Sequence, residues 1–183
     1  MSGKTLHLTI AERIEEAGNI VRLRLVDPKG TALPAFEAGA HLDLHLKDGE
    51  IDLWRQYSLC SDPATADFYE VGVLLDPKSR GGSVAVHRLA TPGTVFEVEG
   101  PRNHFPLDET ARKSVLLGGG IGITPMLAMA QRLHALGHDF TLHYCTRSKD
   151  VTAFRDLIET APWGSKAVLH FDDQQPGQRL DLA

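Results

Sequence analysis

The sequence predicts a β barrel plus an α/β unit, namely a six-stranded antiparallel barrel followed by a partial parallel sheet. From Lys4 to about Leu107, hydrophobic residues alternate with polar ones, which is the period of half-buried strands. The Gly100-Pro101 pair interrupts this pattern, and beyond it short apolar runs alternate with segments of helical periodicity. We therefore expect two domains, over residues 1–107 and 108–183.

Six short strands and one short helix are expected in the first domain. Asp48-Gly49 is a hairpin signal between two of the strands, and Gly81-Gly82 precedes the expected helix at Ser83–Leu89. The expected strands cover residues 6–10, 21–25, 42–46, 51–59, 69–75 and 95–99. Short strands of this number and spacing are typical of a closed antiparallel barrel.

The second domain is expected to have the order strand, helix, strand, helix, strand. The strands are predicted at residues 115–117, 140–145 and 166–171, and the helices at residues 124–136 and 151–160. Units in this order build parallel sheets, because each helix carries the chain back to the start of the next strand.

Composition excludes several classes of protein. The 183 residues include 19 Lys and Arg against 24 Asp and Glu, a formal net charge of −5, and the basic residues are spread singly along the chain. Nucleic-acid binding is therefore not expected. The N-terminal twenty residues carry several charges, and the longest uncharged run, Ser114–Ala130, is shorter than a membrane span. We expect a soluble, cytoplasmic protein without a signal peptide.

Cysteine and histidine spacing argues against a metal centre within the chain. Cys60 and Cys145 are far apart and form no C-x-x-C pair, so neither an iron–sulfur cluster nor a zinc site is expected. His41 and His45 share a strand face without a carboxylate at matching spacing, and His134 and His138 flank a helix-ending glycine.

A glycine-rich segment, residues 117–125, lies between an expected strand and an expected helix. Glycines there allow backbone N–H groups to approach a pyrophosphate at the helix N-terminus. The segment departs from the G-x-G-x-x-G fingerprint and has the form G-x-G-x-x-P. Its candidate binding residues are Gly119, Gly120, Gly122, Thr124 and Pro125.

The end of the next strand lacks the acid that usually holds the ribose hydroxyls of a dinucleotide. Thr146 and Arg147 follow Cys145 instead, and an arginine can meet a ribose phosphate or a pyrophosphate. The choice between NADH and NADPH therefore stays open, and Arg147 is equally typical of a solvated surface.

Two further elements in the barrel suit a phosphorylated ring. Arg55, Gln56, Tyr57 and Ser58 end a strand with a charged fork, a flat aromatic face and a small hydroxyl. The segment Arg80–Ser83 opens the short helix and offers backbone N–H groups to an anion. Taken singly, Tyr57 is equally typical of a tyrosine in the core, and the segment Arg80–Ser83 is equally typical of a plain turn.

Four motifs in this order resemble the ferredoxin–NADP reductase superfamily, and within it the phthalate dioxygenase reductase and vanillate demethylase reductase family. The motifs are Arg55–Cys60, Arg80–Ser83, Pro101–Leu107 and Gly119–Met126. The resemblance implies an NAD(P)H-dependent flavoprotein enzyme with FMN rather than FAD. Such an enzyme passes electrons through a 2Fe–2S centre to a Rieske-type aromatic oxygenase or demethylase.

The resemblance also assigns roles to residues. Arg55, Gln56, Tyr57 and Ser58 hold the flavin, with backbone contact from Val73. The remaining residues bind the flavin phosphate (Gly81, Gly82 and Ser83), shape the nicotinamide site (Gly119, Gly120, Gly122, Thr124 and Pro125) or meet the nucleotide further out (Thr146 and Arg147). Ser58 and Thr124 are the candidate catalytic residues, as hydrogen-bonding partners near flavin N5. Asp172 is a weaker ribose candidate or a solvated loop acid.

Three predicted strands are about half of a nucleotide-binding sheet, and the C-terminal 2Fe–2S ferredoxin domain of the family is absent. We therefore expect a fragment or truncated form, monomeric, which binds flavin and requires a cluster supplied from outside the chain. Two alternatives stay open. One is a stand-alone flavin reductase or FAD-type ferredoxin reductase, and the other is a flavin-binding module without turnover.

Overall fold

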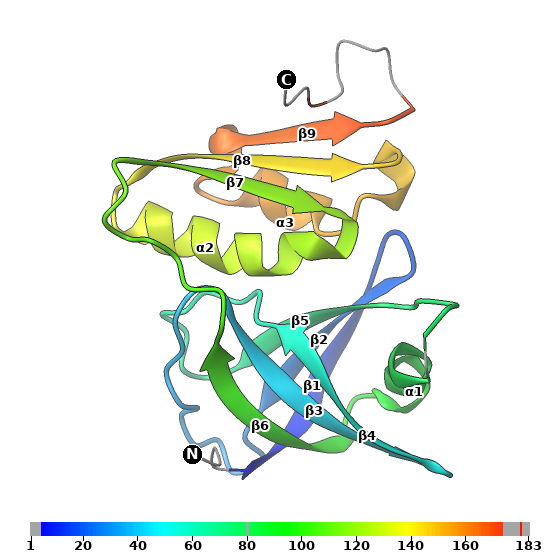
Figure 1. Ribbon diagram of the computed structural model, residues 1–183. Helices are drawn as coiled ribbons and strands as arrows, with labels where there is room; N and C mark the ends of the chain where they lie inside the picture. Colours follow the sequence, from blue (N-terminus) through cyan, green and yellow to red (C-terminus); the bar gives the residue numbers. More distant parts are fainter. Residues whose placement is uncertain (1–4, 80, 174–179, 181–183) are drawn as a thin grey trace.

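A computed structural model describes residues 5–79, 81–173 and 180, and it has two stacked parts (Figure 1). Six antiparallel strands form one sheet in the order β4-β3-β6-β1-β2-β5, and three parallel strands form a second in the order β7-β8-β9. Arg80 and most residues after Asp173 lie outside the described part. The predicted fold class, a barrel followed by a parallel sheet, is confirmed.

The first sheet curls into a barrel around an apolar interior. Its strands are β1 (Thr5–Glu16), β2 (Ile20–Val26), β3 (Ala40–Asp48), β4 (Ile51–Ser58), β5 (Tyr69–Leu74) and β6 (Val95–Asn103). Leu42, Leu44 and Leu46 of β3 are fully buried inside the barrel, whereas Asp43 and His45 between them lie on the other face of the strand. The ends of the sheet meet through a bridge between Leu59 and Val71, next to the last residue of β4.

Between β5 and β6 lies the short helix α1 (Gly82–Leu89), beside the barrel strands (Figure 1). Its apolar side chains Ala85 and Val86 are buried. His87 Nε2 donates a hydrogen bond of 2.9 Å to the carbonyl oxygen of Val73 in β5. This bond fixes the helix against the barrel wall.

The second sheet consists of β7 (Lys113–Gly119), β8 (Asp139–Thr146) and β9 (Ala167–Phe171). The helices α2 (Ile123–Ala135) and α3 (Arg155–Thr160) cover the face of this sheet that is turned toward the barrel (Figure 1). Single turns of 3-10 helix, η1 (Gly120–Gly122), η2 (Lys149–Val151) and η3 (Gly164–Lys166), join these elements. The buried hydrophobic side chains of both parts form one connected cluster.

Several element boundaries differ from the sequence expectation. Strand β1 extends to Glu16, because residues 12–16 pair with β2 although they are mostly charged. Strand β6 continues past Gly100-Pro101, and Asn103 still pairs with Ala40. Helix α3 begins at Arg155, because Phe154 before it has a left-handed backbone with φ of 58°.

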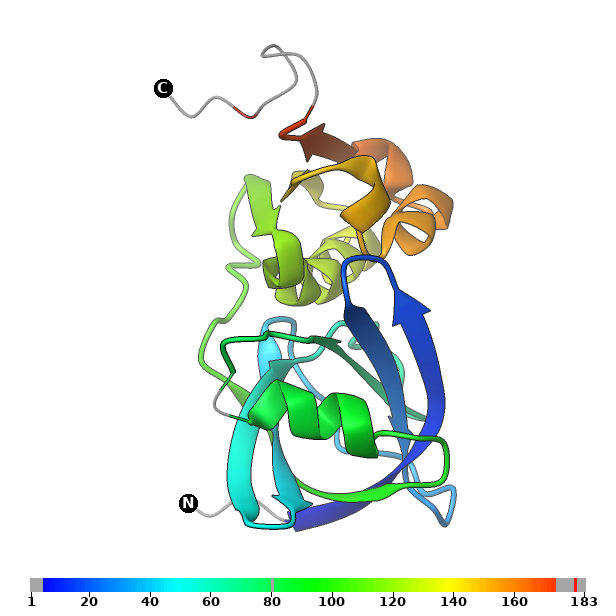
Figure 2. The same cartoon turned by 90° about the vertical axis from the view of Figure 1, so that its right-hand side faces the viewer.

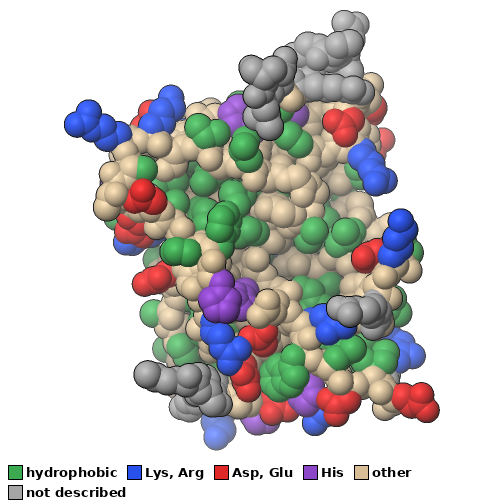
Figure 3. Space-filling view, viewed as in Figure 1, with side chains coloured by type: hydrophobic (Ala, Val, Ile, Leu, Met, Phe, Trp, Pro, Cys, Tyr) green, Lys and Arg blue, Asp and Glu red, His purple; other side chains and the backbone are tan. Residues whose placement is uncertain are grey.

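Charged groups are dispersed over the surface. On the face shown in Figure 3, Lys and Arg side chains are scattered among acidic ones.

Of the helices that the structure describes, none is long and apolar enough to cross a membrane, and the longest, α2, has 13 residues. Within the described ranges, no group of three or more His, Cys, Asp or Glu side chains is placed to hold a metal ion.

Candidate functional site

Arg55 lies against the first residue of α1. The strand period places Arg55 and Tyr57 on one face of β4 and Gln56 and Ser58 on the other. A Cβ added at Gly82 would lie 2.8 Å from Arg55 Nε and 2.9 Å from its Cγ. The structure therefore joins two sequence motifs that lie about 25 residues apart.

The N-terminus of α1 is open to an anion. Gly81 precedes the helix with φ of 91° and has no side chain to cap it, the first turn carries no acid, and of the first-turn N–H groups the structure pairs that of Ser83 with Ser79 Oγ. Unpaired N–H groups and the helix dipole favour negative charge at such an end. Together with the adjacent guanidinium of Arg55, they form a site suited to a phosphate.

Ser83 has a different local role from Gly81 and Gly82. Its N–H donates to Ser79 Oγ at 3.2 Å, and its own hydroxyl oxygen accepts from the Asp76 N–H at 3.1 Å. These bonds tie the preceding loop to the helix, so Ser83 orients the loop in the structure as it stands. Arg80, in the same motif, lies outside the described residues.

The aromatic and polar residues at the end of β4 keep neutral side chains. Burial raises the pKa of Tyr57 to about 12 against a smaller opposing effect of Arg55, so the phenol stays protonated at neutral pH. Ser58 pairs in register with His41, whose pKa is lowered by burial. Gln56 Nε2 lies 3.2 Å from His41 Nε2. Among the described residues, the Ser58 hydroxyl makes no hydrogen bond and is left to donate.

Val73 belongs to the barrel interior. Its side chain is 1% exposed, and its carbonyl oxygen accepts the bond from His87. The side chain of Val73 therefore belongs to the core, and only its backbone is left for the expected contact with a ligand.

The glycines at the end of β7 and in the turn after it divide into two kinds. Gly118 is needed by the fold, since an added Cβ would lie 2.9 Å from Ile123 Cδ1, and Gly120 has φ of 50°. Gly119 and Gly122 have ordinary backbone angles, with φ of −119° and −64°, and nothing lies within 4 Å of a Cβ added at either. Open space in front of two glycines that the fold does not require points to a ligand that approaches the backbone.

Helix α2 begins one residue earlier than expected, at Ile123. Pro125 is therefore its third residue, which the helix tolerates because the first four N–H groups have no intrahelical partner. The buried Thr124 hydroxyl donates to the carbonyl oxygen of Ile121 at 3.0 Å. While that bond is kept, Thr124 can accept a hydrogen bond from a ligand but cannot donate one.

Thr146 and Arg147 stand at the carboxyl end of β8, level with the glycine turn after β7. The Thr146 hydroxyl is buried and bonded to Thr152 Oγ1 at 2.7 Å, so it holds the turn that follows. Arg147 is exposed. The Asp172 N–H donates to the Thr146 carbonyl at 3.0 Å, which places Asp172 at the same edge of the sheet.

The two groups of candidate residues approach each other at β5. A Cβ added at Gly72 would lie 2.8 Å from Thr124 Cγ2 and 2.8 Å from Phe154 Cζ. Gly72 also follows Val71, which is bridged to the residue after Ser58. The carboxyl ends of β7, β8 and β9 point to the side of the molecule on which α1 lies (Figure 1).

Two residues that shape this site, Gly72 and His87, lie outside the sequence motifs. Gly72 could have been found, because a glycine within a strand pattern signals a close backbone approach. His87 gave no such signal, since its partner Val73 lies on another element.

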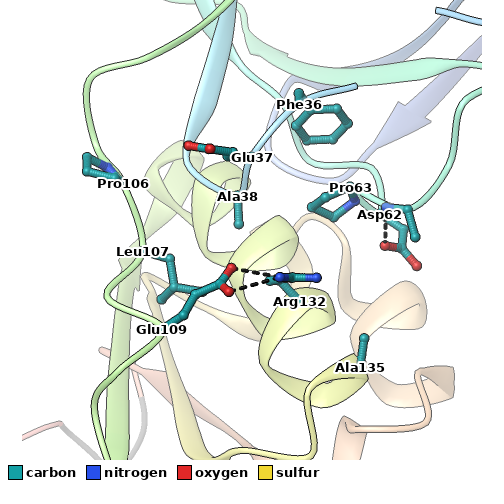
Figure 4. A pocket seen from close by; sticks show the side chains of 11 residues that line it. Phe36, Glu37, Ala38, Asp62, Pro63, Pro106, Leu107, Glu109, Arg132 and Ala135 are labelled. Carbon is teal, nitrogen blue, oxygen red and sulfur yellow. Dashed lines mark hydrogen bonds and ion pairs between the residues drawn. The ribbon is translucent and has the colours of Figure 1, made fainter. Parts of the chain in front are cut away.

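A separate cavity of about 450 Å³ lies between the barrel and the C-terminal part of α2 (Figure 4). Arg132 faces Glu109 there in a two-bond ion pair of 2.7 and 2.9 Å. None of the predicted site residues lines this cavity.

Comparison with known proteins gives a consistent result, although no protein-family model matches the chain. It is 44% identical over 174 residues to the vanillate O-demethylase oxidoreductase of Pseudomonas putida, covering 95% of this chain and 53% of that protein. It is 41% identical over 178 residues to the phthalate dioxygenase reductase of Burkholderia cepacia, covering 97% and 54%.

Solved structures agree. A phthalate dioxygenase reductase, described as a modular structure for electron transfer from pyridine nucleotides to [2Fe–2S], superimposes with a TM-score of 0.89 at 41% identity. That match covers 97% of this chain and 55% of the solved chain. The FAD/NAD-binding domain of a Vibrio cholerae nitric oxide dioxygenase shares the fold, with a TM-score of 0.85 at 20% identity. The chain spans about half the length of the curated relatives it matches.

Proposed function

This chain is a homologue of the phthalate dioxygenase reductase and vanillate O-demethylase oxidoreductase family, and from this premise we propose that it binds FMN and NAD(P)H as an oxidoreductase serving an oxygenase. The observation that carries the proposal is the approach of Arg55 to the open N-terminus of α1. A guanidinium and a helix end that converge on one point suit the terminal phosphate of a mononucleotide.

The residues present fit a flavin mononucleotide. Gly81 and Gly82 leave a cradle that a Cβ would fill, with Arg55 beside it, and Tyr57 offers a neutral flat face on the same side of β4. In this proposal Gly81, Gly82 and Ser83 hold the phosphate, while Gln56, Ser58 and the backbone at Val73 border the ring. When bound, the flavin accepts a hydride from the nicotinamide and passes electrons onward.

The pyridine nucleotide is proposed to lie along the carboxyl ends of β7 and β8. Gly119 and Gly122 provide open backbone, Gly120 and Pro125 shape the turn, and Thr146 holds the neighbouring loop; Arg147, exposed nearby, is available to a phosphate. Ser58 is proposed to donate, and Thr124 to accept, a hydrogen bond near the reacting centre. The role of the protein is then mainly positioning.

We further propose that the two parts of the chain bind different cofactors. Residues 1–107 form the flavin domain and residues 108–183 the nucleotide domain, and the protein works as a cytoplasmic monomer. Its electrons pass to a Rieske-type oxygenase by way of a 2Fe–2S cluster outside this chain. The oxygenase partner is supported by the relatives, which are named as reductases of oxygenase or demethylase systems.

The experiment is to reconstitute the purified chain with flavin, identify the flavin that it retains, and add NADH under anaerobic conditions. We expect retention of FMN and bleaching of its visible band. Retention of FAD alone would favour an FAD-type reductase, and rapid turnover of free flavin would favour a stand-alone flavin reductase. A bound flavin that no nicotinamide cofactor bleaches would overturn the enzyme proposal in favour of a binding module.

A further inference from the structure

The hairpin between β1 and β2 reaches from the barrel to the α/β half (Figure 2). At its tip, a Cβ added at Gly18 would lie 2.7 Å from the carbonyl oxygen of Val151, in the turn before α3. Glu16, the last residue of β1, makes a direct bond across the same junction, since its Oε2 accepts the N–H of Phe154 at 2.8 Å. The two residues are 138 positions apart in the sequence.

Phe154 needs such a partner because of its position. It precedes α3 with a left-handed backbone, φ 58° and ψ 14°, and no side chain from its own segment caps the helix. A phenylalanine side chain cannot accept a hydrogen bond from the first N–H groups, as Ser, Thr or Asp would. The carboxylate of Glu16 does not replace that cap; it holds the N–H of Phe154 itself and so fixes, from the barrel, the residue at which α3 starts.

Glu16 is itself held by buried charges. Its Oε1 lies 3.0 Å from Arg22 Nε, and Arg22 lies 3.4 Å from Glu70, which also pairs with Arg24 at 2.9 Å. Glu70 is 5% exposed. The carboxylate thus belongs to a chain of ion pairs across β2 and β5, and its position is tied to the barrel wall.

The ring of Phe154 packs between this junction and the candidate site. The side chain is fully buried, and its Cζ atom and the Thr124 methyl group both lie 2.8 Å from a Cβ added at Gly72. A shift of Phe154 therefore changes the packing between β5 and the start of α2. That packing sets how closely the barrel and the glycine turn approach.

We propose that Glu16 is a positioning residue for hydride transfer, which holds Phe154 and so fixes the separation of the flavin and nicotinamide sites. This proposal rests on the proposed function. In the step concerned, the C4–H bond of NADH breaks and its hydrogen moves with both electrons to flavin N5. NADH is thereby oxidised to NAD⁺ and the flavin gains two electrons. Glu16 touches neither reactant and acts only through Phe154.

The test compares Glu16→Ala with two matched variants of the flavin-loaded chain. Glu16→Gln keeps an oxygen that can accept the Phe154 N–H, and Glu15→Ala removes a neighbouring carboxylate that is 70% exposed and pairs only with Arg13 among the described residues. Three quantities are measured: the flavin dissociation constant, the rate of flavin reduction by NADH, and amide hydrogen exchange over residues 152–160.

For Glu16→Ala we expect exchange over residues 152–160 to become about fivefold faster through loss of the bond to the Phe154 N–H, and flavin reduction to slow by at least about tenfold. Flavin affinity should stay unchanged. Glu16→Gln should recover most of both losses, and Glu15→Ala should match the unaltered chain. An unchanged reduction rate in Glu16→Ala, or a loss of flavin binding in that variant, would overturn the positioning role. Absence of reduction in the unaltered chain would instead refute the proposed function, and the positioning role with it.

Discussion

The contact between Arg55 and Gly82 allows the phosphate role to be separated from folding. In Gly82→Ala, the new Cβ would lie 2.8 Å from Arg55 Nε, 2.9 Å from Cγ and 3.2 Å from Cδ, against an ordinary contact of at least 3.4 Å. Relief requires a movement of about 0.6 Å, and the atoms that must move belong to a flexible side chain. Gly82 is the first residue of α1 and lacks a positive φ. Alanine there favours the helix by about 0.5–1 kcal/mol.

The expected result is a chain of equal or slightly higher thermal stability that binds FMN more weakly. Displacement of one charge-assisted hydrogen bond costs about 1.5–3 kcal/mol, which corresponds to about 10- to 150-fold in the dissociation constant. Quenching of FMN fluorescence measures the affinity, and thermal unfolding of the flavin-free chain measures the stability. Val84→Ala, at an exposed position of α1, is the matched control and should leave the affinity unchanged. FMN affinity equal to that of the unaltered chain in both Gly82→Ala and Arg55→Ala would refute the phosphate site.

Three further outcomes are expected. Gly72→Ala should lower the free energy of unfolding by about 1–3 kcal/mol in a denaturant titration, because its Cβ would meet both the buried Phe154 ring and the Thr124 methyl group at 2.8 Å; an unchanged midpoint would contradict the packing described. Gly122→Ala should keep its stability but weaken NAD(P)H binding, whereas Gly118→Ala should lose stability first; titration and melting of both variants distinguish them. Hydrogen bonds to two neighbouring carboxylates raise the pKa of His45 above 6.5, so the stability it contributes is complete below about pH 6.5 and is lost as the pH rises through the raised value. Unfolding of His45→Gln between pH 5 and 9 should lack that dependence, and an identical pH profile would count against it.

Local patterns in the sequence were sufficient to predict most of the fold. The alternation at Leu42, Leu44 and Leu46 defines a barrel strand because one face of an antiparallel strand is buried and the other is solvated. The same alternation does not predict the end of β1, since residues 12–16 are mostly charged and are held by pairing with β2. The start of α3 was missed because a left-handed Phe154 is stabilised by Glu16, a partner far away in the sequence.

The sequence motifs indicate which residues belong to the candidate site but do not distinguish their structural roles from their binding roles. In residues 118–122, Gly118 and Gly120 satisfy packing and backbone demands of the fold, while Gly119 and Gly122 satisfy neither. A sequence pattern counts all four glycines alike, because it records only the absence of a side chain. The space in front of each one separates the two causes, and only the glycines with open space and ordinary backbone angles bear on a ligand. The proposed nucleotide site therefore depends on Gly119 and Gly122, and Gly122→Ala tests it without disturbing the fold.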